Sequence, residues 1–351
     1  MSRLLTKPKA RAAAIALGSL FVLGLLGGAL GNEFGGGFLG SPIAHIQLPA
    51  ENITATPAIG GFNITNTMIA GWAAIFVLAL LSFLATRRVQ EVPGRLQSLM
   101  ETVLEFFLSL AESVAGPEKA RRFFPLVMTI FLFIVTANWM GILPGYGTVG
   151  RFEPADEVIH HAEEKAREDG EEADLSKLNL QIFDRDGSLA VLSFGSVDDV
   201  ITAEELGDSH DENVGLLVPF LRSANTDLNT TLAIAIVAMV MVHWWGFSVL
   251  GVFGHAGKFI NFKGGPIGLF VGVLELVSEL ARVISFTFRL FGNMFAGEVL
   301  LIAMAFLIPL VGLVPFMGLE LFVGLIQAFI FSMLTLVFAT TATVSHAAED
   351  H

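Results

Sequence analysis

The chain has 351 residues, of which 54% are hydrophobic and only 15% charged, a composition typical of an integral membrane protein. It contains no cysteine, which excludes disulfide bonds and thiolate metal sites. The net charge of −13 arises in residues 151–213, where 19 acidic side chains outnumber 5 basic ones, and the absence of a large basic cluster argues against nucleic-acid binding.

The N-terminal region, residues 1–40, begins with an apolar segment at 12–30. Basic residues precede it at positions 3, 7, 9 and 11. This pattern is typical of a signal peptide or a signal anchor. No clear small-x-small cleavage site follows, which favours an uncleaved anchor before a glycine-rich linker.

Residues 41–145 contain the first two predicted core membrane helices, at 67–85 and 123–143, because about 20 apolar residues are needed to span a bilayer. Between them, Leu96, Leu99, Val103 and Phe106/Phe107 recur at helical spacing, which predicts an amphipathic helix at the membrane surface. Basic residues at 87, 88, 119, 121 and 122 flank this connection and predict that it is cytoplasmic.

Residues 146–217 form an acidic segment, predicted to be a small α+β extracytoplasmic insert. Charge spacing predicts a helix over 154–167. The runs 178–183 and 189–194 predict a β-hairpin around an Asp184–Gly187 turn. This turn lacks the ligand spacing of a calcium loop, so we interpret the segment as a solvated domain without a metal.

Residues 218–351 contain a span at 228–250 and two long helices, 268–307 and 316–344. Both long helices exceed the thickness of a bilayer, so strong tilting is expected. The stretch His243–Trp245 is interpreted as an interfacial anchor. The fold class is therefore an all-α integral membrane protein with five core membrane helices. Two of these five helices form a long tilted helical hairpin. The chain also contains an amphipathic surface helix, a possible extra N-terminal helix and the small α+β extracytoplasmic insert.

Arg289 lies inside the first long helix, where a charge costs several kcal/mol and cannot be removed by deprotonation. Ser285, Arg289 and Asn293 form one polar stripe, and Gly297 continues it and would allow a close helix approach. A structural ion pair is the alternative. No acid lies three or four residues from Arg289, which favours a role in moving ions or protons.

Counting from the connection between the long helices places Glu298 and Glu320 in the outer half of the membrane and Glu275 near the inner surface. Membrane carboxylates usually mark proton or ion routes. Glu275 and Glu279 could instead snorkel or pair with Arg282. Asn293 and Gln327 could be ordinary interhelical hydrogen-bonding residues.

The sequence resembles subunit a of the membrane-embedded Fo sector of ATP synthase, from about residue 41 to the C-terminus. The stretches that carry the resemblance are Arg289–Met294 with Ala296–Glu298, Val92–Arg95, Asn138–Trp139 with Leu143–Pro144, Ser223–Asn229 and Leu325–Phe329. The resemblance departs at Glu320, which is histidine in some members. It also departs at Val283, which replaces a common proline, and at Gly141, which replaces a common acid.

The resemblance implies a non-catalytic, cofactor-free stator subunit that conducts protons to a ring of c subunits through two half-channels. Its partners would be the c-ring, b-type peripheral stalk subunits and the rest of the FoF1 complex in a bacterial plasma membrane. Arg289 matches the essential arginine. Glu298 and Glu320 match outer positions and Glu275 an inner one, while Asn293 and Gln327 match polar residues around the arginine.

A self-contained secondary transporter or ion channel is the alternative function, although neither inverted repeats nor a broken helix is evident. A membrane scaffold is a third possibility, which would leave Arg289 unexplained. Counting along the helices places Gln327 about 16 Å and Arg289 about 27 Å from the connection. We therefore expect these two side chains to be near one another without a direct hydrogen bond.

Overall fold

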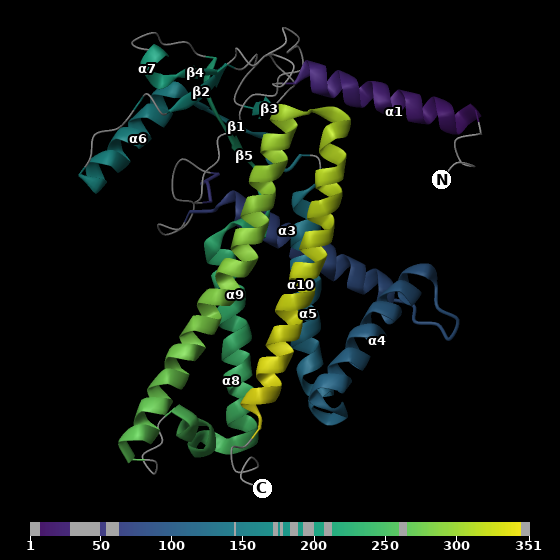
Figure 1. Ribbon diagram of the computed structural model, residues 1–351, viewed down its shortest axis with the longest axis vertical. Helices are drawn as coiled ribbons and strands as arrows, with labels where there is room; N and C mark the ends of the chain where they lie inside the picture. Colours follow the sequence, from purple (N-terminus) through teal and green to yellow (C-terminus); the bar gives the residue numbers. More distant parts are fainter. Residues whose placement is uncertain are drawn as a thin grey trace. The chain divides into compact units, whose positions relative to one another are not determined.

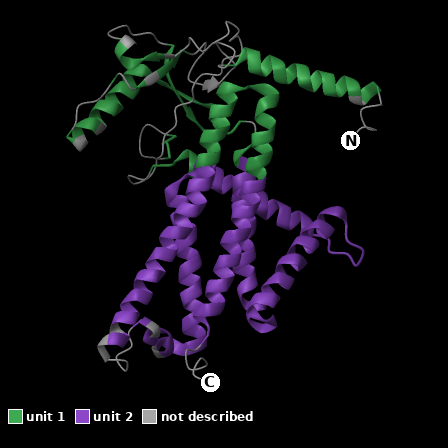
Figure 2. Ribbon diagram, in the orientation of Figure 1, with its two compact units in different colours: residues 1–69, 141–222, 296–321 green, residues 70–140, 223–295, 322–351 purple. Residues whose placement is uncertain are grey.

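The computed structural model of the chain divides into two compact units (Figure 2). Unit 1 comprises residues 1–69, 141–222 and 296–321, and unit 2 comprises residues 70–140, 223–295 and 322–351. The structure describes residues 8–28, 50–53, 63–143, 145–170, 175, 178–182, 189–191, 200–206, 213–259 and 265–344. Two long helices contribute to both units.

Within the described part of the chain, five helices are long and apolar enough to cross a membrane (Figure 1). They are α3 (Asn66–Thr86), α5 (Pro117–Gly141), α8 (Leu228–Phe259, apolar as far as Val252), α9 (Gly265–Leu307) and α10 (Val314–Ala342, apolar from Leu310). The five predicted core helices are thereby confirmed. The N-terminal helix α1 (Pro8–Gly27) is also present, but its apolar part is shorter.

The core of unit 2 is built from apolar side chains of α4 (Arg95–Ala115), α5, α8, α9 and α10. Aromatic rings join these helices in pairs: the ring centroids of Phe107 and Phe131 are 4.1 Å apart, and those of Phe286 and Phe331 are 4.6 Å apart. Leu290 on α9 is fully buried in this core. Packing therefore determines which face of α9 turns away from the core. Arg289 immediately precedes Leu290, so its side chain points about 100° away from that buried leucine.

The amphipathic helix is present as α4, but its buried face differs from the predicted stripe. Phe107 and Ala111 are buried, whereas Leu99 and Phe106 are exposed. The 3.6-residue period allowed either of the two adjacent phenylalanines to face the core. Contact with Phe131 on α5 selects Phe107.

Helix α8 changes direction at Gly251, whose φ of 72° is readily available only to glycine. The predicted interfacial anchor before this point is wrong for Trp245, which is buried with its ring centroid 4.5 Å from that of Phe123. Trp244 is exposed as an anchor requires. Two adjacent residues on a helix point about 100° apart, so one tryptophan faces the core when the other does not.

Unit 1 contains a five-stranded antiparallel sheet with the strand order β3-β1-β5-β2-β4. The strands are β1 (Val149–Pro154), β2 (Asn179–Ile182), β3 (Leu189–Val191), β4 (Val200–Thr202) and β5 (Val214–Pro219), and the helices α6 (Ala155–Asp169) and α7 (Ala203–Leu206) accompany them. Leu180, Val214 and Val158 pack in its core. The small α+β character of the insert is confirmed.

The predicted β-hairpin within this insert is wrong. Strands form in both predicted runs, but β2 pairs with β4 and β5, while β3 pairs with β1. Pairing beside β5 buries Leu180 completely, and such long-range burial outweighs a local turn signal. The predicted turn, Asp184–Gly187, lies outside the described residues.

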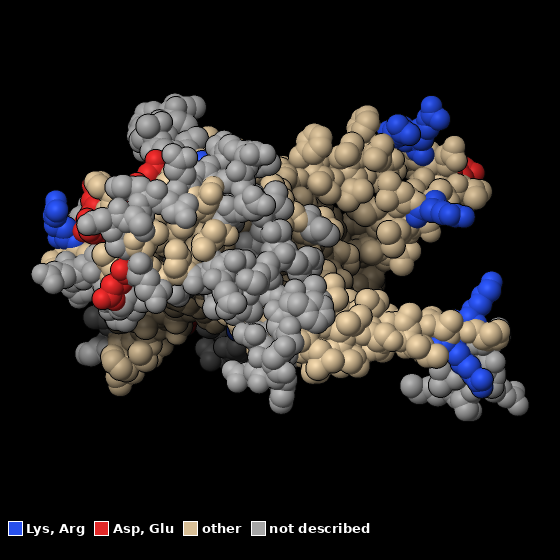
Figure 3. Space-filling model, turned by 90° about the horizontal axis from the view of Figure 1, so that it is seen from above, with Lys and Arg blue, Asp and Glu red and all other residues tan. Residues whose placement is uncertain are grey.

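The described acidic side chains of α6 are exposed, and acidic side chains are visible on the surface in Figure 3. They are Asp156, Glu157, Glu163 and Glu164. Solvated charge of this kind fits the predicted solvated domain.

The connection between the two long helices also belongs to unit 1 and contains the 3-10 helix η5 (Leu310–Leu313). Gly24 of α1 and Gly28, the residue after this helix, pack so closely on Pro309 that a Cβ on either glycine would overlap it. Two glycines one helical turn apart thus let α1 lie directly against this connection.

Candidate functional site

The polar stripe on α9 lies beside the buried core of unit 2. Helix α9 is continuous, so Ser285, Arg289 and Asn293 share one face at four-residue spacing. Ser285 and Asn293 are exposed and Arg289 is half-buried. The predicted stripe is therefore positioned by an adjacent apolar face that is locked into the core.

Arg289 has no acidic partner in the part of the chain that the structure describes, since none of the ion pairs there involves it. A guanidinium within a membrane helix requires compensation for its charge. The arrangement leaves Arg289 able to attract a negative group supplied by another molecule.

Gln327 on α10 contacts the stripe through Asn293, whose Nδ2 donates a hydrogen bond to Gln327 Oε1 at 2.8 Å. Both residues lie about 20 Å along their helices from the connection. Gln327 is only 3% exposed, and its Nε2 donor has no hydrogen-bond partner. Gln327 therefore contacts Asn293, which lies one helical turn from Arg289 on α9.

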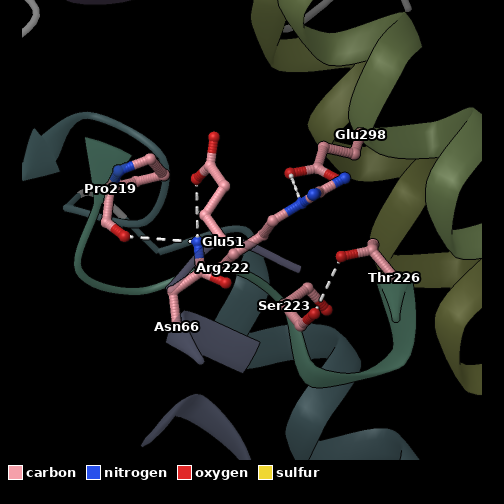
Figure 4. A network of polar contacts seen from close by, with 7 residues as sticks. All are labelled: Glu51, Asn66, Pro219, Arg222, Ser223, Thr226 and Glu298. Carbon is pink, nitrogen blue, oxygen red and sulfur yellow. Dashed lines mark hydrogen bonds and ion pairs between the residues drawn. The ribbon is translucent and has the colours of Figure 1, made fainter. Parts of the chain in front are cut away.

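Glu298, also on α9, belongs to unit 1 and forms a bidentate ion pair with Arg222 (Figure 4). Arg222 Nε donates to Oε1 at 3.1 Å, and Nη2 donates to Oε2 at 3.1 Å. Arg222 follows strand β5 and is only 4% exposed. Two parallel hydrogen bonds from a guanidinium make a strong, directional contact.

Glu51 lies beside this ion pair and was not identified from the sequence. Asn66, the first residue of α3, donates its Nδ2 to Glu51 Oε2 at 3.0 Å and to the carbonyl oxygen of Pro219 at 3.3 Å. Burial raises the pKa of Glu51 to about 7; the charges of Glu298 and Glu153 add to the rise, while Arg222 and the Asn66 hydrogen bond oppose it.

The sequence signal that could have led to this group is Arg222, a lone cation that ends the apolar run of β5. Glu51 itself carries no such signal, because it lies in a short described segment before α3, outside every predicted helix. Backbone hydrogen bonds from Asn66 N to the Glu51 carbonyl oxygen and from Ile53 N to the Ile64 carbonyl oxygen bring its segment to the site.

Glu320 on α10 is 9% exposed and packs against Gly297 of α9. A Cβ at position 297 would overlap the Glu320 carboxyl group, so this side chain occupies the space that Gly297 leaves open. The two predicted outer acids therefore have different surroundings in unit 1. Glu298 binds a cation, whereas Glu320 fills the space that a glycine leaves.

The predicted inner residue Glu275 is half-buried on α9, and of the two acids for which pairing with Arg282 was considered, Glu279 forms the pair. Glu279 contacts Arg282 Nη1 closely and lies 3.7 Å from His243 Nε2. His243 Nδ1 is 3.2 Å from His255 Nε2. His243 is thus part of a polar cluster inside unit 2, which corrects its interpretation as an interfacial anchor.

Two of the stretches that carry the resemblance meet at a pair of buried asparagines in unit 2. Asn225 Nδ2 donates to Asn138 Oδ1 at 2.7 Å, and Asn138 Nδ2 donates to the carbonyl oxygen of Gly324 at 3.2 Å. These bonds tie α5, α10 and the 3-10 helix η3 (Ala224–Thr226) together. The asparagines hold α10, which carries Gln327, in register with its neighbours.

The comparison with known proteins agrees with this arrangement. The family model described as ATP synthase A chain matches residues 68–340. ATP synthase subunit a of Gloeobacter violaceus is 30% identical over 287 residues, which cover 82% of this chain and 86% of that protein. The corresponding subunit of Moorella thermoacetica is 25% identical over 288 residues, which cover 82% and 95% of the two chains. The subunit of Helicobacter pylori is 25% identical over 290 residues, which cover 81% and 93%. The chain belongs to the ATP synthase A chain family.

Proposed function

We propose that this chain is the proton-conducting stator subunit of a rotary ATP synthase. In this role it provides two half-channels to the carboxylates of a c-subunit ring and couples proton flow to ring rotation and ATP synthesis. The observation that carries the proposal is Arg289, a cation in a membrane-spanning helix without an acidic partner among the described residues. Family membership supports the same function.

Arg289 acts on the carboxylate that each c subunit presents. A nearby cation stabilises the ionised form of a carboxylate, which the low dielectric of the membrane otherwise disfavours. The carboxylate therefore gives up its proton as it reaches Arg289. The fixed positive charge also repels protons that would otherwise leak directly from one half-channel to the other.

Polar residues on both sides of Arg289 supply the two routes. Glu298 and Glu320 line the outer route, and Glu275 lines the inner one. Ser285 and Asn293 continue the stripe along α9, and the Asn293–Gln327 hydrogen bond holds that stripe against α10. Such fixed side chains can orient water and the incoming carboxylate without reorganising during each step.

The proposed location is a bacterial plasma membrane, with helix α4 and the C-terminus in the cytoplasm and the acidic insert outside. Basic residues at both ends of the α4 region support this orientation. The proposed protein partners are the c-ring, b-type peripheral stalk subunits and the remaining FoF1 subunits.

The test is ATP-driven proton pumping by the reconstituted complex with Arg289→Ala. We expect pumping to be abolished, because the other described cation on α9, Arg282, lies two helical turns away and is paired with Glu279. Arg121→Ala, at a highly exposed guanidinium on α5, is the matched control and should pump normally. Wild-type rates for Arg289→Ala would overturn the proposal.

A second measurement separates this function from a self-contained secondary transporter or channel. The purified chain alone in lipid vesicles should show no ion flux, because its partner carboxylate is on another subunit. Sustained flux through the chain alone would favour the transporter.

A further inference from the structure

Three charged residues from separate segments meet in unit 1 (Figure 4). Glu51 precedes α3, Arg222 follows β5, and Glu298 lies on α9. The two carboxylates interact with the Arg222 guanidinium in different ways. Glu298 binds it through both oxygens, whereas Glu51 is attracted to it without a bidentate contact of that kind.

The surroundings of Glu51 leave it able to change its charge. Its Oε2 accepts a hydrogen bond from Asn66 at 3.0 Å, and its side chain is partly buried. Glu298 on α9 and Glu153 on β1 repel its negative charge, and Arg222 opposes them. Since burial is the largest influence, its pKa is raised to about 7, so the protonated and ionised forms coexist near neutral pH.

We propose that Glu51 is a proton-exchanging residue of the outer half-channel and that the Arg222–Glu298 ion pair is the fixed charge pair that positions and tunes it. This inference rests on the proposed function. An O–H bond forms on Glu51 as a hydronium ion from the outer side gives up a proton and becomes water, and that bond breaks as the proton passes inward to the next water or carboxylate. Glu298 lines the same route as half of the ion pair.

The test is the pH dependence of proton flux through the reconstituted complex with Glu51→Gln. We expect wild-type flux to show a titration step near pH 7 and Glu51→Gln to lose it. Glu51→Asp keeps a carboxyl group and should retain a step, which also covers the case in which the glutamine variant assembles poorly. Glu163→Gln, an exposed acid on α6, is the matched control and should leave the profile unchanged.

Arg222→Lys and Arg222→Met report on the ion pair. The lysine retains the positive charge, so the step should stay near its wild-type pH. The methionine removes an attraction that lowers the pKa of Glu51, so the step should move to higher pH.

The failure of this inference is distinguishable from failure of the proposed function. A Glu51→Gln profile identical to wild type, in a complex that Arg289→Ala still inactivates, would overturn the role of Glu51 alone. Pumping by the Arg289→Ala complex would overturn both.

Discussion

Two arginines of this chain, Arg222 in unit 1 and Arg289 in unit 2, differ in how their charge is compensated. Arg222 is almost completely buried and gives two hydrogen-bond donors to Glu298. Arg289 is half-buried and forms no ion pair with any described acid. The same side chain therefore serves as an internal counter-charge in one unit and as an available charge in the other.

The difference shows that an arginine among apolar residues does not by itself identify the functional group. The two arginines differ in whether a described carboxylate pairs with the guanidinium group. A buried ion pair satisfies both of its members, and removing one leaves an uncompensated charge. A charge without a partner among the described residues costs stability, and our proposal is that Arg289 is retained for an interaction outside the chain.

The largest expected effect on stability is at Arg222. Arg222→Met should destabilise the chain by about 3 kcal/mol, because Glu298 would remain partly buried without its cation. Arg289→Met should not destabilise it, because this change breaks no ion pair with a described acid. Chemical unfolding of the detergent-solubilised chain measures both.

The double variant Arg222→Met with Glu298→Gln is the control for this prediction, since it removes both charges together. It should recover most of the lost stability. Equal destabilisation by the two arginine substitutions would end the distinction between the arginines.

A smaller effect is expected at Gly297, the residue against which the Glu320 carboxyl group packs. Gly297→Ala should lose most of the roughly 1 kcal/mol that alanine gains over glycine in a helix, because the new Cβ must displace the Glu320 carboxyl group. Gly318→Ala on α10 is the matched control, since a Cβ there meets no atom within 4 Å. Thermal unfolding that ranks the two variants in the opposite order would contradict the close packing of α9 and α10 at this point.

The smallest effect is expected at the Asn293–Gln327 hydrogen bond beside Arg289. Asn293→Ala should lower stability by only about 0.6 kcal/mol, the typical size of a hydrogen bond between membrane helices. A double-mutant cycle with Gln327→Ala isolates this contact. A coupling energy near zero would show that the two side chains do not depend on one another.

Much of the helical architecture was predictable from the sequence, because membrane helices are recognised by long apolar runs alone. The core spans, the connection around Pro309 and the four-residue stripe from Ser285 to Asn293 agree with the structure. These features depend on local composition and on the period of the α-helix. Contacts with other elements are not needed to recognise them.

The β-sheet and the finer choices within helices were less predictable. Strand β2 was expected to pair with β3 but pairs with β4 and β5. Phe107 faces the core in place of Phe106, and Trp245 is buried beside exposed Trp244. Each outcome is a choice between local alternatives of nearly equal propensity, which long-range packing decides.

The sequence by itself determined the class of the protein, the five membrane helices and the presence of Arg289 as an expensive charge within one of them. Only the tertiary structure decided which charges have partners. Glu51, Arg222 and Glu298 are far apart in the chain, and their meeting depends on how β5, α3 and α9 come together in unit 1. Electrostatic partnership depends on distance in space and on burial, neither of which a linear sequence contains.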